Sequence, residues 1–195
     1  MPTLQRFMMF LRTQDAAKFI ESMIVCFAAP VIGGLKCGAL LNLSRGDSDM
    51  MTAWISVREE IGRRYGLEFA EISCSKTSVL LLIYRSCLLR DQLHNDETRE
   101  FLAELGYEFE ERGAVAPYIR RLVSRFEAGL PHEVGIFLGY PLEDVKGFME
   151  NGGRNSKLSG YWKVYGDEAA AQRKFKEYRR AETESAEILM SCQFE

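Results

Sequence analysis

The hydrophobic positions of this chain follow two spacings, one typical of amphipathic helices and one typical of short strands. Helical spacing, bounded by capping residues and glycines, predicts helices over residues 15–28, 49–65, 96–105, 114–128, 142–150 and 168–190. Short apolar runs predict strands over residues 39–43, 67–73, 78–84, 134–138 and 161–165. The pattern therefore indicates a protein built from both helices and strands.

Capping residues support several of these helix boundaries. Asp47 or Ser48 is predicted to cap the second helix, and Asn95 and Asp167 are predicted to cap the third and the last. Gly66 ends the second helix, because glycine readily adopts the left-handed conformation that terminates helices.

The order of the elements suggests how the strands pair. Residues 78–84 (SVLLLIY) are apolar on both faces, as in the middle of a covered sheet. A short turn joins them to residues 67–73, which favours an antiparallel hairpin. The strand–helix–strand order over residues 134–165 favours a right-handed parallel crossover. We therefore expect residues 1–195 to form a single domain of the α/β or α+β class, with a mixed sheet of about five strands flanked by helices.

Composition and charge argue against two classes of binding partner, nucleic acids and membranes. The chain has 195 residues, a net charge of −3, and Lys and Arg spread along its length. Because no basic patch stands out, the sequence argues against a nucleic-acid partner. The apolar run at residues 23–32 is too short to cross a bilayer and lies behind two acidic residues, Asp15 and Glu21. The sequence thus predicts no membrane association and a cytoplasmic location.

Five cysteines are present, and their spacing is irregular. They are Cys26, Cys37, Cys74, Cys87 and Cys192. An odd count without a CxxC pair predicts free thiols in a reducing compartment, with no disulfide framework and no structural metal site. The residues do not indicate which cofactor, if any, the protein uses.

The segment around His132 is the most unusual part of the chain. His132 lies beside Glu133 and before a predicted buried strand, so the pair could act as general acid and base or bind a metal. Adjacent strand residues point to opposite faces, however, so the two would not act on one atom. The alternative is that His132 caps a turn and Glu133 forms an ion pair.

Two glycine-containing segments are candidates for phosphate-binding loops. Residues 139–144 connect a predicted strand to a helix, but Glu143 and Asp144 would repel phosphate, which favours a structural turn. Residues 33–38 lack the Walker spacing, although Lys36 could supply a positive charge. Cys37 could be a nucleophile served by His132, or an ordinary core thiol.

Further candidates lie at strand ends. Arg85 follows the buried strand 78–84 and could face a cleft at its end. The aromatic residues of 161–165 (YWKVY) could form a stacking wall for a planar ligand or simply complete a sheet.

Two strings, PHEVGIFLGYPLEDVKGF at residues 131–148 and GYWKVY at residues 160–165, occur in this order. They resemble the signature of the bacterial domain-of-unknown-function family 3793. The segments IGGLK (32–36) and LIYR (82–85) also fit that family, so the resemblance spans nearly the whole chain.

The resemblance implies a stand-alone cytoplasmic protein with no established activity. It also implies an association with flavodoxin and iron-transport genes, and so with metal or redox physiology. Cys37 stands where the pattern has proline, which argues against a thiol mechanism. The residues that match the signature, and are therefore the preferred site residues, are His132, Glu133, Tyr140, Asp144, Trp162 and Lys163.

Three functions follow as hypotheses. The first is a small-ligand-binding or accessory protein in metal or redox homeostasis, with a site formed by Lys36, Arg85, His132, Tyr140, Trp162 and Lys163. The second is an enzyme that uses His132 as acid or base, with Glu133 or Asp144 as its partner. The third is a protein–protein interaction module that uses the helix at residues 168–190 or the exposed face of the helix at residues 114–128.

Overall fold

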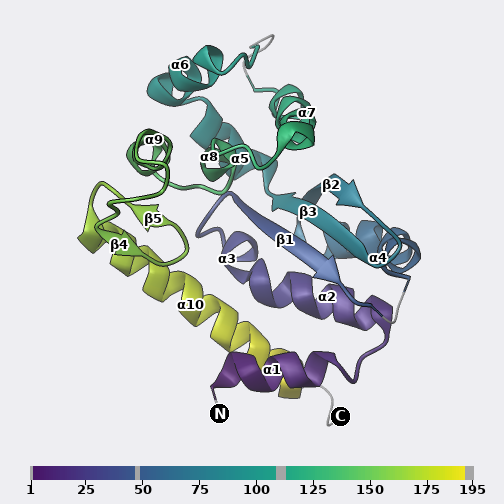
Figure 1. Cartoon of the computed structure of the whole chain (residues 1–195). Coiled ribbons are helices and arrows are strands. Elements are labelled where there is room, and N and C mark those ends of the chain that lie inside the picture. Colours follow the sequence, from purple (N-terminus) through teal and green to yellow (C-terminus); the bar gives the residue numbers. More distant parts are fainter. Residues whose placement is uncertain (1, 47–48, 109–112, 192–195) are drawn as a thin grey trace. The chain divides into compact units, whose positions relative to one another are not determined.

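The computed structural model describes residues 2–46, 49–108 and 113–191, which group into two compact units (Figure 1). Unit 1 combines the chain up to Leu35 with Ala39–Tyr84 and the residues from Glu177 onward, and unit 2 combines Lys36–Gly38 with Arg85–Lys176. Each unit is defined by its dense internal contacts and not by independent folding. The expectation of a single domain therefore stays a prediction.

Unit 1 contains a three-stranded sheet and the helices packed with it. Its elements are α1 (Thr3–Leu11), α2 (Ala16–Phe27), α3 (Ala29–Ile32), β1 (Gly38–Ser44), α4 (Met50–Tyr65), β2 (Glu68–Cys74), β3 (Ser78–Tyr84) and the C-terminal part of α10 (Glu168–Ser191). The strand order is β1-β3-β2, and β2 and β3 pair antiparallel. The predicted hairpin and the central position of residues 78–84 are thus confirmed.

The core of unit 1 forms where apolar faces meet. Helix α2 packs against α4, and α4 packs on β2 and β3 (Figure 1). Ile20, Ile24, Trp54 and Leu81 are completely buried there. Burying such side chains contributes roughly 1.5–3 kcal/mol each, which is why the helical stripe and the apolar strand specify this packing.

The helix boundaries of unit 1 follow the capping signals. The Asp15 carboxylate accepts a 2.8 Å hydrogen bond from Lys18 N at the start of α2. The predicted caps Asp47 and Ser48 lie outside the described residues, and Asp49 accepts from Thr52 N at 3.0 Å. Gly66 ends α4 in the left-handed conformation, as expected.

Unit 2 is mainly helical. Its elements are α5 (Ser86–Leu93), α6 (Asp96–Glu104), α7 (Ala116–Arg125), the 3₁₀ helix η1 (Phe126–Ala128), α8 (Val134–Phe137), α9 (Leu142–Glu150), β4 (Leu158–Ser159), β5 (Lys163–Val164) and the N-terminal part of α10. Asn95 caps α6 and Asp167 caps α10 through their side chains, as predicted. Figure 1 shows the β4–β5 hairpin between α9 and the start of α10.

The predicted strand at residues 134–138 is wrong, because Val134–Phe137 form the short helix α8. Val134 N bonds to Pro131 O at 3.1 Å and Leu138 N bonds to Val134 O at 3.0 Å. All four helix residues are buried, so the run shows no amphipathic period. A short apolar run of this kind cannot be distinguished from a strand by its pattern.

The predicted five-stranded mixed sheet and its parallel crossover are also wrong. The described strands form one three-stranded sheet and a separate antiparallel pair, β4 and β5. The predicted strand 161–165 keeps only Lys163–Val164, because the backbone N–H groups of Tyr165 and Gly166 bind the Asp144 carboxylate. The chain is a mixed α+β protein, which was one of the two expected classes.

Besides α8, the helices α1, α3 and α5 were not predicted. Helix α1 buries Phe7 and Leu11, and its neighbour Phe10 is partly buried in the same core. Met8 and Met9, by contrast, are exposed. Leu4, Phe7 and Leu11 have helical spacing and pack in the core, so the helical pattern is present although the segment was not assigned as a helix.

Candidate functional site

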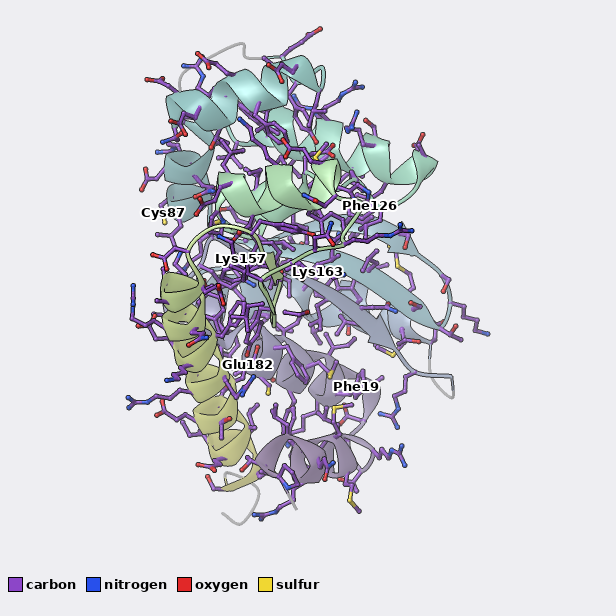
Figure 2. All side chains as sticks on the ribbon, turned by 60° about the vertical axis from the view of Figure 1, so that its left-hand side comes forward. Phe19, Cys87, Phe126, Lys157, Lys163 and Glu182 are labelled. Atoms are coloured by element: carbon purple, nitrogen blue, oxygen red, sulfur yellow. The ribbon has the colours of Figure 1, made fainter. Side chains whose placement is uncertain are left out.

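The segment that contains His132 forms one wall of a pocket in unit 2. The pocket has a volume of about 350 Å³ and is open to solvent. Its described lining residues are Arg125, Ala128, Gly129, Leu130, Pro131, His132, Glu133 and Met149. They come from the end of α7, η1, the loop before α8, and α9; Figure 2 labels Phe126, the first residue of η1.

The backbone turns sharply at Gly129 to form this wall. Gly129 has φ of 122°, a conformation that side-chain-bearing residues rarely adopt. Leu130 follows with 61% of its surface exposed, and Pro131 starts the turn that leads into α8. The loop thus presents an apolar side chain beside polar groups.

Glu133 is buried behind the pocket in a network of charge-assisted hydrogen bonds. Its Oε1 accepts a short hydrogen bond from Arg125 Nε and a 3.1 Å bond from the Tyr107 hydroxyl. Burial, followed by the charge and hydrogen bond of Glu133, raises the pKa of Tyr107, so this phenol stays protonated as a donor. The hydrogen bond to Glu133 likewise raises the pKa of Arg125.

The two partners of this ion pair differ in exposure. The side chain of Glu133 is 2% exposed, whereas that of Arg125 is 31% exposed. Arg125 contacts the protein through Nε and Nη1, the latter at 3.4 Å from Leu105 O. Both side chains line the pocket, and the positive member of the pair is the more exposed one.

His132 is exposed and packs against an aromatic ring. Its imidazole lies edge-on to Phe148, with ring centroids 5.0 Å apart. Because residues 134–137 are helical, the strand argument against joint action of His132 and Glu133 no longer applies. The burial and bonding of Glu133 agree with the alternative that it forms an ion pair.

Asp144 organises the neighbouring β4–β5 hairpin. It is 3% exposed, its Oδ2 accepts from Trp162 Nε1 at 2.7 Å, and its Oδ1 accepts from Tyr165 N at 2.6 Å and Gly166 N at 2.8 Å. A carboxylate with three such donors is well satisfied. These contacts give Asp144 a structural role in tying the hairpin to α9.

Tyr140, Trp162 and Lys36 form a second cluster. The Tyr140 and Trp162 rings stack with centroids 4.8 Å apart, and Lys36 Nζ lies 5.7 Å from the Tyr140 centroid. Trp162 is 7% exposed, and burial raises the pKa of Tyr140 to about 12. The stacking partner of the Trp162 ring is thus Tyr140 itself.

Lys163 and Arg85 each donate a hydrogen bond to a backbone carbonyl. Lys163, labelled in Figure 2, donates a short hydrogen bond to Gly153 O. Arg85 sits between β3 and α5, where its backbone N–H bonds to Cys37 O at 3.1 Å.

The candidate residues therefore fall into separate groups rather than one site. His132 and Glu133 line the pocket, Lys36, Tyr140 and Trp162 form the stacked cluster, and Asp144 holds that cluster to α9.

Cys37 is a buried thiol. It is 5% exposed, and its Sγ lies 3.4 Å from Phe137 O. Burial raises the pKa of Cys37 to about 11, although nearby Lys36 and Lys174 lower it. Since the thiolate is the nucleophilic form, these surroundings suit a core residue better than a nucleophile.

The sequence did not single out Arg125, Tyr107 or Met149 as site residues, nor the lining residues Ala128 and Gly129. Arg125 was visible only as one of several basic residues on an amphipathic helix. No local spacing links it to Glu133, because the ion pair depends on the turn at Gly129. Burying a carboxylate without a cation costs several kcal/mol of free energy. The place of Glu133 beside an apolar run was therefore the available signal that it needs a cationic partner.

Two negative findings concern the described residues alone. Within residues 2–46, 49–108 and 113–191, no group of three or more His, Cys, Asp or Glu side chains is arranged to hold a metal ion. In the same part of the chain, no helix combines the length and the apolar character needed to cross a bilayer.

Fold and site together define an α+β protein with a pocket backed by a buried ion pair. The chain belongs to the family described as Protein of unknown function (DUF3793), whose model matches residues 24–194. This match confirms the resemblance carried by the two sequence strings. No curated protein and no solved structure matches the chain.

Proposed function

We propose that this protein binds a small organic molecule in the pocket beside His132. The observation that carries the proposal is the pocket itself, about 350 Å³ in volume and lined by both apolar and charged side chains. Ligand sites typically occupy roughly 300–1,000 Å³ and combine apolar walls with a few polar groups. Pro131, His132 and Glu133 of the lining are also the first three residues of the first signature string.

The network behind the pocket supports a preorganised site. Tyr107 and Arg125 both bond to Glu133, so the wall is held by buried hydrogen bonds before any ligand arrives. Rigid walls lower the entropic cost of binding. An accessory role in metal or redox homeostasis, the setting that the family resemblance implies, is the physiological part of this proposal.

Binding can be tested by protein-observed NMR with a library of small organic fragments. We expect amide shifts to cluster at residues 125, 128–130, 132, 133 and 149, and His132→Ala to weaken binding at least several-fold. His94→Gln is the matched control, because His94 lies on the α5 side of unit 2 and contacts Gly113 N instead. Shifts that avoid these residues, or no shifts at all, would refute the proposal.

An enzyme that uses His132 as acid or base is a second proposal, favoured by the exposure of this imidazole at the pocket. Glu133 would then be a positioning residue, since its Oε1 already accepts two hydrogen bonds. Turnover of a bound molecule that His132→Ala leaves unchanged would refute it. A protein partner, the third hypothesis, stays a prediction.

A further inference from the structure

The charge of the His132 pocket is set by an ion pair whose two members are unequally exposed. Glu133 is almost completely buried, and its Oε1 is occupied by Arg125 Nε and the Tyr107 hydroxyl. Arg125 keeps about a third of its side chain exposed. The negative charge is therefore neutralised by its partner, whereas part of the Arg125 side chain remains exposed at the pocket.

The geometry of the guanidinium leaves a defined edge for a ligand. Its described contacts use Nε and Nη1, and the Nη1 contact to Leu105 O is long at 3.4 Å. Within the described residues, Nη2 is thus the nitrogen without an assigned acceptor. A planar guanidinium presents its N–H groups in a fork that matches a carboxylate.

The remaining lining residues indicate which chemical groups the rest of the ligand should carry. Leu130, Pro131 and Met149 are apolar, and Met149 can adapt to irregular shapes through its flexible thioether. His132 adds an imidazole that can donate a hydrogen bond to an anionic oxygen. Glu133, the one acidic side chain among the described lining residues, is already neutralised by Arg125.

From these observations we propose that the pocket selects small monocarboxylic acids, with the carboxylate at Arg125 and His132 and an apolar body against Leu130 and Met149. The inference rests on the proposed small-ligand function and specifies its substrate class.

The decisive comparison uses the unmodified protein and matched probes. Benzoate, phenylacetate and hexanoate are titrated beside benzamide, phenylacetamide and hexanamide, which keep the shape but lose the charge. A charge-assisted hydrogen bond contributes more than a neutral one, so we expect each acid to bind about tenfold more tightly than its amide at low salt. Raising the salt concentration should reduce that preference.

Variants test whether Arg125 causes the preference for acids over amides. Arg125→Met should abolish the preference for acids, whereas Arg120→Met, on the same helix and outside the lining, should preserve it. Arg125→Met leaves the carboxylate of Glu133 buried without its cation and could unfold the protein. The double variant Arg125→Met/Glu133→Gln avoids this unpaired charge and should lose the preference for acids in the same way. His132→Gln should retain the preference, since the glutamine amide can also donate.

The possible outcomes distinguish the selection of carboxylates from the small-ligand proposal on which it rests. Acids and amides that bind equally well at the pocket would overturn the selection of carboxylates and leave the small-ligand site standing. If neither set shifts resonances of the pocket residues, the selection of monocarboxylic acids is overturned, and the fragment library alone decides whether the small-ligand site exists. Acid preference that survives both Arg125 variants would place the anion site elsewhere and overturn the inference.

Discussion

Trp162 Nε1 donates a 2.7 Å hydrogen bond to Oδ2 of Asp144, which joins the β4–β5 hairpin to helix α9. The same carboxylate receives two backbone N–H groups from the end of the hairpin. Trp162 also stacks on Tyr140 and meets Phe175 of α10 edge-on, with centroids 4.5 Å apart. One buried carboxylate thus fixes the aromatic cluster of unit 2.

Asp144→Asn should destabilise the protein by about 2–4 kcal/mol, because an amide cannot accept from three donors as a carboxylate does and weakens charge-assisted bonds. Chemical denaturation followed by circular dichroism measures the change. Glu150→Gln, an exposed change on the same helix, is the control and should alter stability little. Equal effects of the two variants would show that Asp144 is not the organising residue.

Gly147→Ala should also destabilise unit 2, although alanine favours helices. A Cβ at this position of α9 would lie 2.5 Å from Cγ of Tyr165, closer than such atoms approach. The helix-propensity gain of about 1 kcal/mol is outweighed by an overpacking cost of roughly 1–3 kcal/mol. Thermal unfolding should show a lowered midpoint.

Gly46→Ala provides the comparison for this variant. Among the described residues, no atom beyond its chain neighbours lies within 4 Å of a Cβ built at Gly46, so its replacement should leave the unfolding midpoint unchanged or slightly raised. A Gly147→Ala protein as stable as Gly46→Ala would mean that Tyr165 moves aside without cost.

Alkaline pH should reveal the burial of Cys37. Its pKa is raised from 9.0 to about 11 in the folded protein, so the unfolded state releases this proton first. The stabilising effect is complete below pH 9 and is lost as pH rises through 11. The free energy of unfolding is expected to fall by about 1.4 kcal/mol between neutral pH and pH 10.

The measurement is urea denaturation at pH 7 and pH 10, with Cys37→Ala beside the unmodified protein. Cys26 and Tyr140, whose pKa values are also raised, contribute to both proteins, so the difference between them isolates Cys37. Identical pH dependence in the two proteins would contradict the assigned cause.

The sequence was most informative where a residue's partner lies close to it along the chain. Asn95 and Asp167 cap helices as predicted, since a cap depends on the next few residues. The apolar run at 134–138 was misread because its burial on all sides removes the helical period.

The candidate site was predicted only in part, for a physical reason. His132 and Glu133 were recognisable as a charged pair beside an apolar run, and both line the pocket. Arg125 and Tyr107, which neutralise and hold Glu133, meet it only through tertiary folding. Sequence spacing carries no record of such contacts.

The final prediction concerns the ion pair between Arg125 and Glu133. Arg125→Met should cost roughly 3 kcal/mol of folding free energy, because it leaves a buried carboxylate without its cation. Adding Glu133→Gln should restore part of that loss, since a neutral amide is cheaper to bury than an unpaired charge. The four proteins of this double-mutant cycle, compared by urea denaturation, give the coupling energy directly. Additive losses in the double variant would show that the two side chains stabilise the fold independently, and that Arg125 reaches the pocket without being held there by Glu133.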